Sequence, residues 1–164
     1  MKLNQPPAAL GFRHPACLLA TGCGVGLLPM APGTWGSLAA LPVAWLITLS
    51  GGPWALLAAS LIAFAAGIWA SGVYAKASGV EDAQTIVIDE IAGQWLALVA
   101  APLHPMAYLA AFALFRLCDI VKPWPVNWAD RNVHGGFGVM LDDMIAGLYA
   151  LIVLQVSLYT IGMA

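Results

Sequence analysis

Charged side chains are scarce in this chain, and long hydrophobic runs take their place. Of the 164 residues, 62% are hydrophobic and only 9% are charged, whereas a soluble domain carries about a quarter charged residues. The composition predicts an all-α, polytopic membrane protein, because helices satisfy their own backbone hydrogen bonds in lipid. The length allows one membrane-embedded domain, residues 1–164, with about four or five short spans.

Basic residues and cysteines are also few. The chain has six Lys and Arg residues and a net charge of -2. This argues against nucleic acid as a partner, because a protein that binds nucleic acid needs a basic stripe on its surface. Three cysteines form no paired framework for structural disulfides. The partners we expect are the membrane and a phospholipid substrate within it.

Gly and Pro interrupt the hydrophobic runs and predict two helical hairpins and a final span. Residues 16–30 contain four Gly and Pro positions, so we expect a re-entrant or interfacial segment there rather than a regular span. The expected spans are residues 37–49 paired with 54–74, residues 85–101 paired with 106–121, and residues 144–162.

In this topology every Lys and Arg lies on one side of the membrane. The positive-inside rule makes that side the cytoplasm, and every carboxylate lies there too. Three spans begin on this side, near Ser37, Thr85 and Met144, and helix N-termini attract anions. We therefore expect the chemistry at the cytoplasmic leaflet.

All eight acidic residues lie between Glu81 and Asp143. A carboxylate at the centre of a membrane helix costs about 2.5 to 3.5 kcal/mol on insertion scales, so a cluster of them suggests a bound divalent cation. Asp89 and Glu90 open the third span, and Asp142 with Asp143 precedes the last. Dipole compensation and N-capping are the alternative explanations for these pairs. Gly93, one turn after Asp89 on the same helix face, should let a neighbouring helix approach the carboxylate closely.

Asp119 is the most diagnostic acid. It lies just before Pro123, in the last turn of a helix, where a negative charge opposes the helix dipole. Local helix stability does not explain it, which favours metal ligation, while pairing with Arg116 is the alternative. We interpret Asp82 and Asp130 as ordinary loop charges.

Glycines and bases near these acids suit a phosphate group. Gly135 and Gly136 permit a backbone nest whose N–H groups could approach phosphate oxygens. Lys122 and Arg131 could bind the same oxygens, with anchoring at the inner leaflet as the alternative. For His134, which could transfer a proton, ordinary loop polarity is the favoured explanation. Because cysteine-phosphatase, Asp-x-Asp and Gly-x-Ser-x-Gly motifs are missing, a phosphatase here would work through carboxylates and metal.

Four ordered motifs carry a family resemblance. They are PGTWGS at 32–37, DEIAG at 89–93, FRLCDIVKPWP at 115–125 and GGFGVMLDD at 135–143. Together they resemble the phosphatidylglycerophosphatase A family. The resemblance implies a Mg²⁺-dependent lipid phosphatase of the bacterial inner membrane, which converts phosphatidylglycerol phosphate to phosphatidylglycerol and inorganic phosphate.

The resemblance also implies the site residues, position by position. The expected catalytic and metal-binding acids are Asp89, Glu90, Asp119, Asp142 and Asp143. The expected substrate-binding residues are Lys122, Arg131, Thr34, Ser37, Gly135 and Gly136.

The mechanism leaves two choices open. We expect one or two Mg²⁺ ions, with water favoured over an aspartate as the attacking group; which acid is ligand and which is base stays open. The alternative function is a small ion or proton transporter, since intramembrane carboxylates also mark conduction paths. The one-sided position of the acids and the lack of a polar relay in residues 54–74 argue against it.

Overall fold

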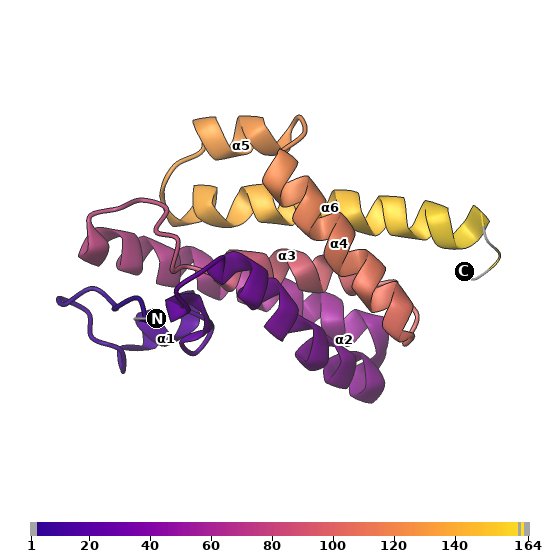
Figure 1. Cartoon of the computed structure of the whole chain (residues 1–164), viewed down its shortest axis with the longest axis horizontal. Helices are drawn as coiled ribbons and strands as arrows, with labels where there is room; N and C mark the ends of the chain where they lie inside the picture. Colours follow the sequence, from indigo (N-terminus) through magenta and orange to yellow (C-terminus); the bar gives the residue numbers. More distant parts are fainter. Residues whose placement is uncertain (1–2, 161, 163–164) are drawn as a thin grey trace.

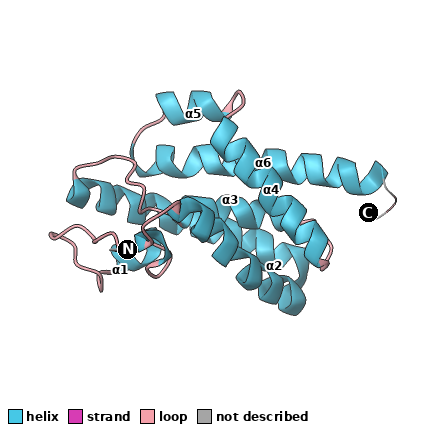
Figure 2. Ribbon diagram, viewed as in Figure 1, coloured by secondary structure: helices cyan, strands magenta, loops and turns pink. Residues whose placement is uncertain are grey.

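The computed structural model describes residues 3–160 and 162. Every regular element in that part of the chain is a helix and none is a strand, so the all-α prediction is confirmed (Figures 1 and 2). The helices are α1 (Pro15–Ala20), a 3-10 helix (Val25–Leu27), α2 (Pro32–Ser78), α3 (Ile88–Leu98), α4 (Pro105–Val121), α5 (Val126–Asn132) and α6 (Gly135–Thr160).

α2 consists of two helices joined at a sharp kink. Gly52 has φ 71° and ψ -172°, which no helix accommodates, and Pro53 follows it. The chain reverses there, so the darker first half and the lighter second half run back along each other (Figure 1). Leu41 and Leu56 accordingly share one buried cluster. The first predicted hairpin is therefore present, with longer arms than predicted.

Two helices, α2 and α6, are long and apolar enough to cross a membrane, which does not establish the four or five spans expected. Residues 85–101 were predicted to form the third span, but the helix observed there, α3, is shorter. α3 has 11 residues, or about 16 Å, roughly half the hydrocarbon thickness of a bilayer. Thr85 lies before the helix, where its hydroxyl bonds the Tyr74 hydroxyl at 2.8 Å.

α6 begins at Gly135, well before the predicted start of the last span at residue 144. The predicted glycine loop is therefore wrong for Gly136 and Gly138, which lie in the first turn of the helix, whereas Gly135 at its start has a positive φ of 73°. A Cβ on Gly136 would overlap the Ile68 carbonyl of α2, so the glycine serves close helix packing. Asp142 and Asp143 consequently lie inside the helix and not at its N-cap.

α3 and α6 cross at a point where each helix has a glycine. A Cβ on Gly93 would lie 2.5 Å from the Asp143 carbonyl oxygen, and a Cβ on Gly147 would overlap the Gly93 carbonyl. The two backbones therefore touch, as in small-residue crossings of membrane helices. The expectation that Gly93 admits a neighbouring helix beside the carboxylates is confirmed, and the neighbour is α6.

The N-terminal segment is not a continuous span. α1 is followed by turns in which Cys23 and Gly24 have positive φ, and then by the 3-10 helix. Figure 1 shows it against the start of α2 and the chain that leads into α3. The Val87 amide donates to the Ala20 carbonyl at 2.8 Å, which ties this segment to the beginning of α3.

Candidate active site

A cavity of about 340 Å³ opens where α2, α3, α4 and α6 meet. Its lining comes from the first turns of α2 and α3, the loop before α3, the end of α4 and the first half of α6. Six acidic and two basic side chains line it, so acids predominate. They are Asp82, Asp89, Glu90, Asp119, Asp142, Asp143, Arg116 and Lys122.

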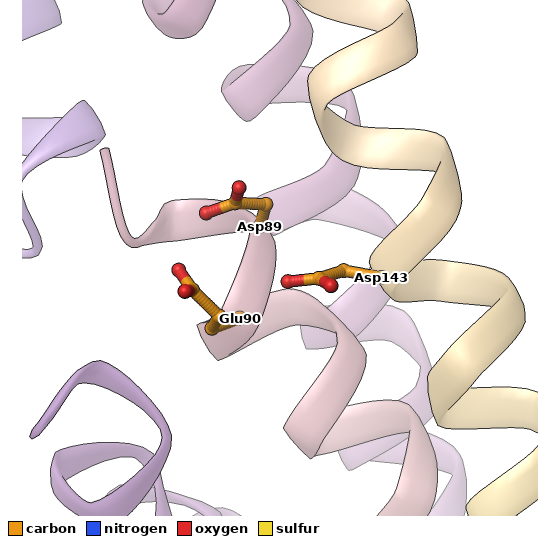
Figure 3. Close-up of side chains that lie close together, drawn as sticks. All are labelled: Asp89, Glu90 and Asp143. Atoms are coloured by element: carbon orange, nitrogen blue, oxygen red, sulfur yellow. The ribbon is translucent and has the colours of Figure 1, made fainter. Parts of the chain in front are cut away.

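Three carboxylates converge in this cavity. Asp89 and Glu90 from α3 and Asp143 from α6 point toward one another (Figure 3), and each offers an oxygen within 4.8 Å of the other two. We call these three residues the carboxylate triad. Asp89 is 8% exposed and Asp143 3%, so like charges are confined together away from bulk water.

The triad meets the requirements of a hard divalent cation. Asp89 Oδ1 and Glu90 Oε2 are buried, and neither finds a hydrogen-bond partner in the described part of the chain. Leaving buried carboxylate oxygens without donors is costly. Oxygen atoms from carboxylates are the ligands that Mg²⁺ prefers. The residues present therefore fit such an ion.

Gly33 of α2 makes room for Glu90. A Cβ at that position would collide with the Glu90 carboxylate. The first turn of α2 can therefore lie directly against the first turn of α3. Pro32, whose fixed φ suits the start of a helix, begins this turn. The PGTWGS motif thus forms one wall of the cavity.

Asp119 lines the cavity but lies outside the triad. Its Oδ2 forms an ion pair with Arg116 Nη1 at 2.7 Å, which is the alternative that the sequence left open. Arg116 Nη1 also lies 3.7 Å from Glu90 and 3.4 Å from the Ser37 hydroxyl. Arg116 is therefore the cation that joins α4 to both α2 and α3.

Lys122 is the second cation of the cavity. Its amine donates to Asp142 at 2.8 Å and to Asp130. Burial lowers the pKa of the amine, but these two carboxylates outweigh burial and raise the pKa above its ordinary value. Lys122 is thus charged at neutral pH, and it holds Asp142 apart from the triad.

Thr34 and Ser37 take different positions. Thr34 lines the cavity from the first turn of α2. Ser37 lies one turn further on and is fully buried, where its hydroxyl donates to the Gly33 carbonyl at 2.9 Å and accepts from Arg116. Of the two, only Thr34 faces the cavity; Ser37 supports Arg116 from behind.

Besides Ser37, three further predicted substrate-binding residues do not line this cavity. Gly135 donates its N–H to the Glu81 carboxylate. Gly136 packs against α2. Arg131 is exposed on α5 and is absent from the cavity lining. The early start of α6 accounts for Gly136, which lies in a helical turn.

Asp82 and Arg116 line the cavity, although neither is among the site residues predicted from the sequence. Asp82 lines the cavity from the loop before α3, and burial raises the pKa of its carboxyl although nearby Lys122 lowers it. Loop residues carry no periodic signal, so nothing in the sequence places Asp82 beside α6. Arg116 could have been found from its register, three residues before Asp119 on one helix face.

A helical, membrane-associated protein with a cavity of carboxylates and two cations has the features of an enzyme that acts on phosphate esters. Residues 18–158 match the family model Phosphatidylglycerophosphatase A, and the chain belongs to this family. The predicted family and the predicted enzyme class, a phosphoric monoester hydrolase, are therefore confirmed. The alternative, a small ion or proton transporter, receives no support.

The chain is similar to curated proteins over most of its length. It is 45% identical to phosphatidylglycerophosphatase A of Escherichia coli (strain K12) over 141 residues, which are 85% of this chain and 81% of the relative. It is 40% identical to the protein of the same name from Haemophilus influenzae over 154 residues, 93% of this chain and 94% of the relative. A Bacteroides thetaiotaomicron protein with the provisional name phosphatidylinositol-3-phosphatase is 40% identical over 152 residues, 88% of this chain and 94% of the relative. No solved structure matches the chain.

Proposed function

We propose that this protein hydrolyses the terminal phosphate of phosphatidylglycerol phosphate, giving phosphatidylglycerol and inorganic phosphate, with Mg²⁺ as cofactor. It would do so as a multi-pass protein at the cytoplasmic leaflet of a bacterial inner membrane. The observation that carries the proposal is the convergence of Asp89, Glu90 and Asp143 beside Arg116 and Lys122. The names of two relatives support the choice of substrate.

The metal would be held by the carboxylate triad. When bound, Mg²⁺ neutralises charge on phosphoryl oxygens and lowers the pKa of a coordinated water. The buried oxygens of Asp89 and Glu90 without donors support this assignment. Asp119 and Asp142 would then act mainly on the two basic residues, since each already forms an ion pair with one of them.

Arg116 would bind and orient the phosphate. Its guanidinium is fixed by Asp119 and Ser37, and its buried Nε has no partner among the described residues. A guanidinium with a free N–H suits phosphate oxygens. Because Arg116 is fixed in advance, little side-chain entropy is lost when the phosphate binds.

Lys122 would supply a second positive charge from another wall of the cavity. Asp130 and Asp142 keep its amine protonated and in place. Two cations beside the triad would hold the phosphoryl group in one orientation, so that a nucleophile can approach in line with the leaving glycerol oxygen. Water stays our favoured nucleophile, because the chain lacks the Asp-x-Asp motif of phosphoenzyme formation.

The test is phosphate release by purified protein from a panel of phospholipid monophosphates. The panel holds phosphatidylglycerol phosphate, phosphatidic acid and phosphatidylinositol 3-phosphate, each with Mg²⁺ and with a chelator. We expect the highest kcat/KM for phosphatidylglycerol phosphate and no release with chelator. Activity that survives the chelator would reject the metal, and a preference for phosphatidylinositol 3-phosphate would reject the substrate.

A further inference from the structure

A second hollow lies along the seam between the first half of α2 and α4. It has a volume of about 590 Å³, and every residue lining it is apolar or aromatic. Leu41, Trp45 and Leu46 contribute from α2, and Tyr108 and Leu109 from α4. We call it the apolar groove.

The apolar groove and the carboxylate cavity lie along the same two helix faces. On α2, Thr34 of the cavity is followed seven and eleven residues later by Leu41 and Trp45 of the groove. On α4, Arg116 of the cavity follows Leu109 of the groove by seven residues. Residues at these spacings share one face of a helix. The two hollows are therefore opposite ends of one seam.

Side-chain contacts close the seam at two places. At the polar end, Arg116 donates to Ser37 at 3.4 Å. At the apolar end, the rings of Trp45 and Tyr108 meet edge to face with centroids 4.9 Å apart. Eleven residues of α2 separate Thr34 from Trp45, which corresponds to about 16 Å along the helix axis.

Apolar side chains are exposed on the outer surface of the seam between these two contacts. Leu38, one turn after Thr34, is 39% exposed. The groove itself is edged by Leu46 and Leu109, which are 64% and 50% exposed. α2 is one of the two helices apolar enough to cross a membrane. These side chains would consequently face lipid tails.

We propose that the apolar groove receives an acyl chain of the lipid whose phosphate occupies the carboxylate cavity, and that the lipid enters sideways between α2 and α4. The inference rests on the proposed phosphatase function. A phospholipid monophosphate carries an anionic end and apolar chains in one molecule, and the seam offers cationic, metal-binding and apolar parts in the same order. This continuity favours an acyl chain over a second protein as the occupant.

The experiment measures the chain-length preference of the purified enzyme. Hydrolysis of dipalmitoyl and dihexanoyl phosphatidylglycerol phosphate is compared in mixed micelles of one fixed composition with Mg²⁺. The wild-type protein should prefer the long chains, since each buried methylene favours binding. Leu109→Trp fills the groove and should lower the ratio of the two kcat/KM values by at least about tenfold, equivalent to about 1.4 kcal/mol.

Leu117→Trp is the matched control. It is the same substitution on the same helix, at an exposed residue that does not line the groove, and it should leave the ratio at the wild-type value. Leu46→Trp fills the groove from α2 and decides the outcome if Leu109→Trp does not fold.

Each outcome separates the groove from the proposed function. A wild-type protein that releases no phosphate from either lipid overturns the proposed function, and the inference with it. An active wild-type protein without chain-length preference overturns the groove alone. The groove is also overturned if both groove variants keep the wild-type ratio of kcat/KM values, or if Leu117→Trp lowers this ratio as much as they do.

Discussion

Asp142 and Asp143 are neighbours on α6, yet they lie in two different electrostatic environments. Asp143 joins Asp89 and Glu90 in the carboxylate triad, whereas Asp142 accepts a hydrogen bond from Lys122 at 2.8 Å. The lysine compensates the charge of Asp142, whereas the three triad carboxylates have Arg116 nearby only at 3.7 Å from Glu90, so the triad keeps an excess of negative charge that an ion could balance. One helix therefore contributes to the proposed metal site and to the ion pairs that surround it.

The triad and its ion-paired surroundings should respond differently to loss of charge. Asp143→Asn should lower kcat by roughly 100-fold to 1000-fold or more, the range for removing one group from a preorganised electrostatic site. It also removes a like charge from beside Asp89 and Glu90. In chelator, its thermal unfolding temperature should equal or exceed that of the wild type.

Thermal unfolding with and without Mg²⁺ gives a readout independent of turnover. Mg²⁺ should raise the unfolding temperature of the wild type, since a ligand that binds the folded state stabilises it. The shift should vanish in Asp143→Asn. A variant that lost activity but kept the full shift would place the metal elsewhere.

The triad also depends on the helix crossing beneath it. Gly147→Ala inserts a methyl group into the Gly93 carbonyl of α3, and overpacking of this kind costs about 1 to 3 kcal/mol. Because the crossing sets the distance between α3 and Asp143, activity should fall with stability. Circular dichroism melting in detergent and phosphate release measure the two effects.

Gly72→Ala is the matched control for this substitution. Its Cβ would meet nothing closer than 3.9 Å, at Gly136. Both changes gain the helix propensity of alanine, worth roughly 0.5 to 1 kcal/mol, so the difference between them isolates the steric effect. If Gly147→Ala melts no lower than Gly72→Ala, the crossing does not hold the triad together.

The sequence predicts much of this site because its acids are linked to helices. Asp89 and Glu90 begin α3 as expected, and Gly93 predicts a close neighbour for that helix. The same reasoning fails at residues 135–138. Glycine permits both a tight loop and a close helix contact, and only the partner decides between them. Since that partner is α2, more than sixty residues away along the chain, local sequence holds no sign of it.

Local sequence pattern predicts only some of the charge pairs. The i−3 relation makes the Asp119 to Arg116 pair readable from sequence, although Asp119 was favoured as a metal ligand. By contrast, Lys122 reaches Asp142 across twenty residues and two helices. Residue type alone could identify Asp119 and Asp142 as site residues. It could not show which basic residue each of these acids pairs with.

Asp142→Asn tests the ion-paired surroundings of the triad. It weakens the attachment of Lys122 without removing a triad ligand, so the loss in kcat/KM should be roughly 10-fold to 100-fold, as for residues that orient a metal site from outside. Stabilisation by Mg²⁺ should persist, in contrast to Asp143→Asn. A melting profile of Asp142→Asn that no longer responds to Mg²⁺ would make Asp142 a ligand and remove the distinction between the neighbours.

Arg131 should show the smallest effect, although the family resemblance places it at the phosphate. It is exposed on α5 and lies outside the cavity lining, whereas Arg116 is fixed inside the cavity. Exposed substitutions usually change free energies by no more than about 0.5 kcal/mol, so kcat/KM of Arg131→Ala should stay within about twofold of wild type. Arg116→Ala should raise KM and lower kcat together, because it removes a phosphate contact and releases Asp119. If Arg131→Ala were the more damaging of the two, α5 would have to close over the cavity when substrate binds, and the phosphate would be held by a base from outside the cavity.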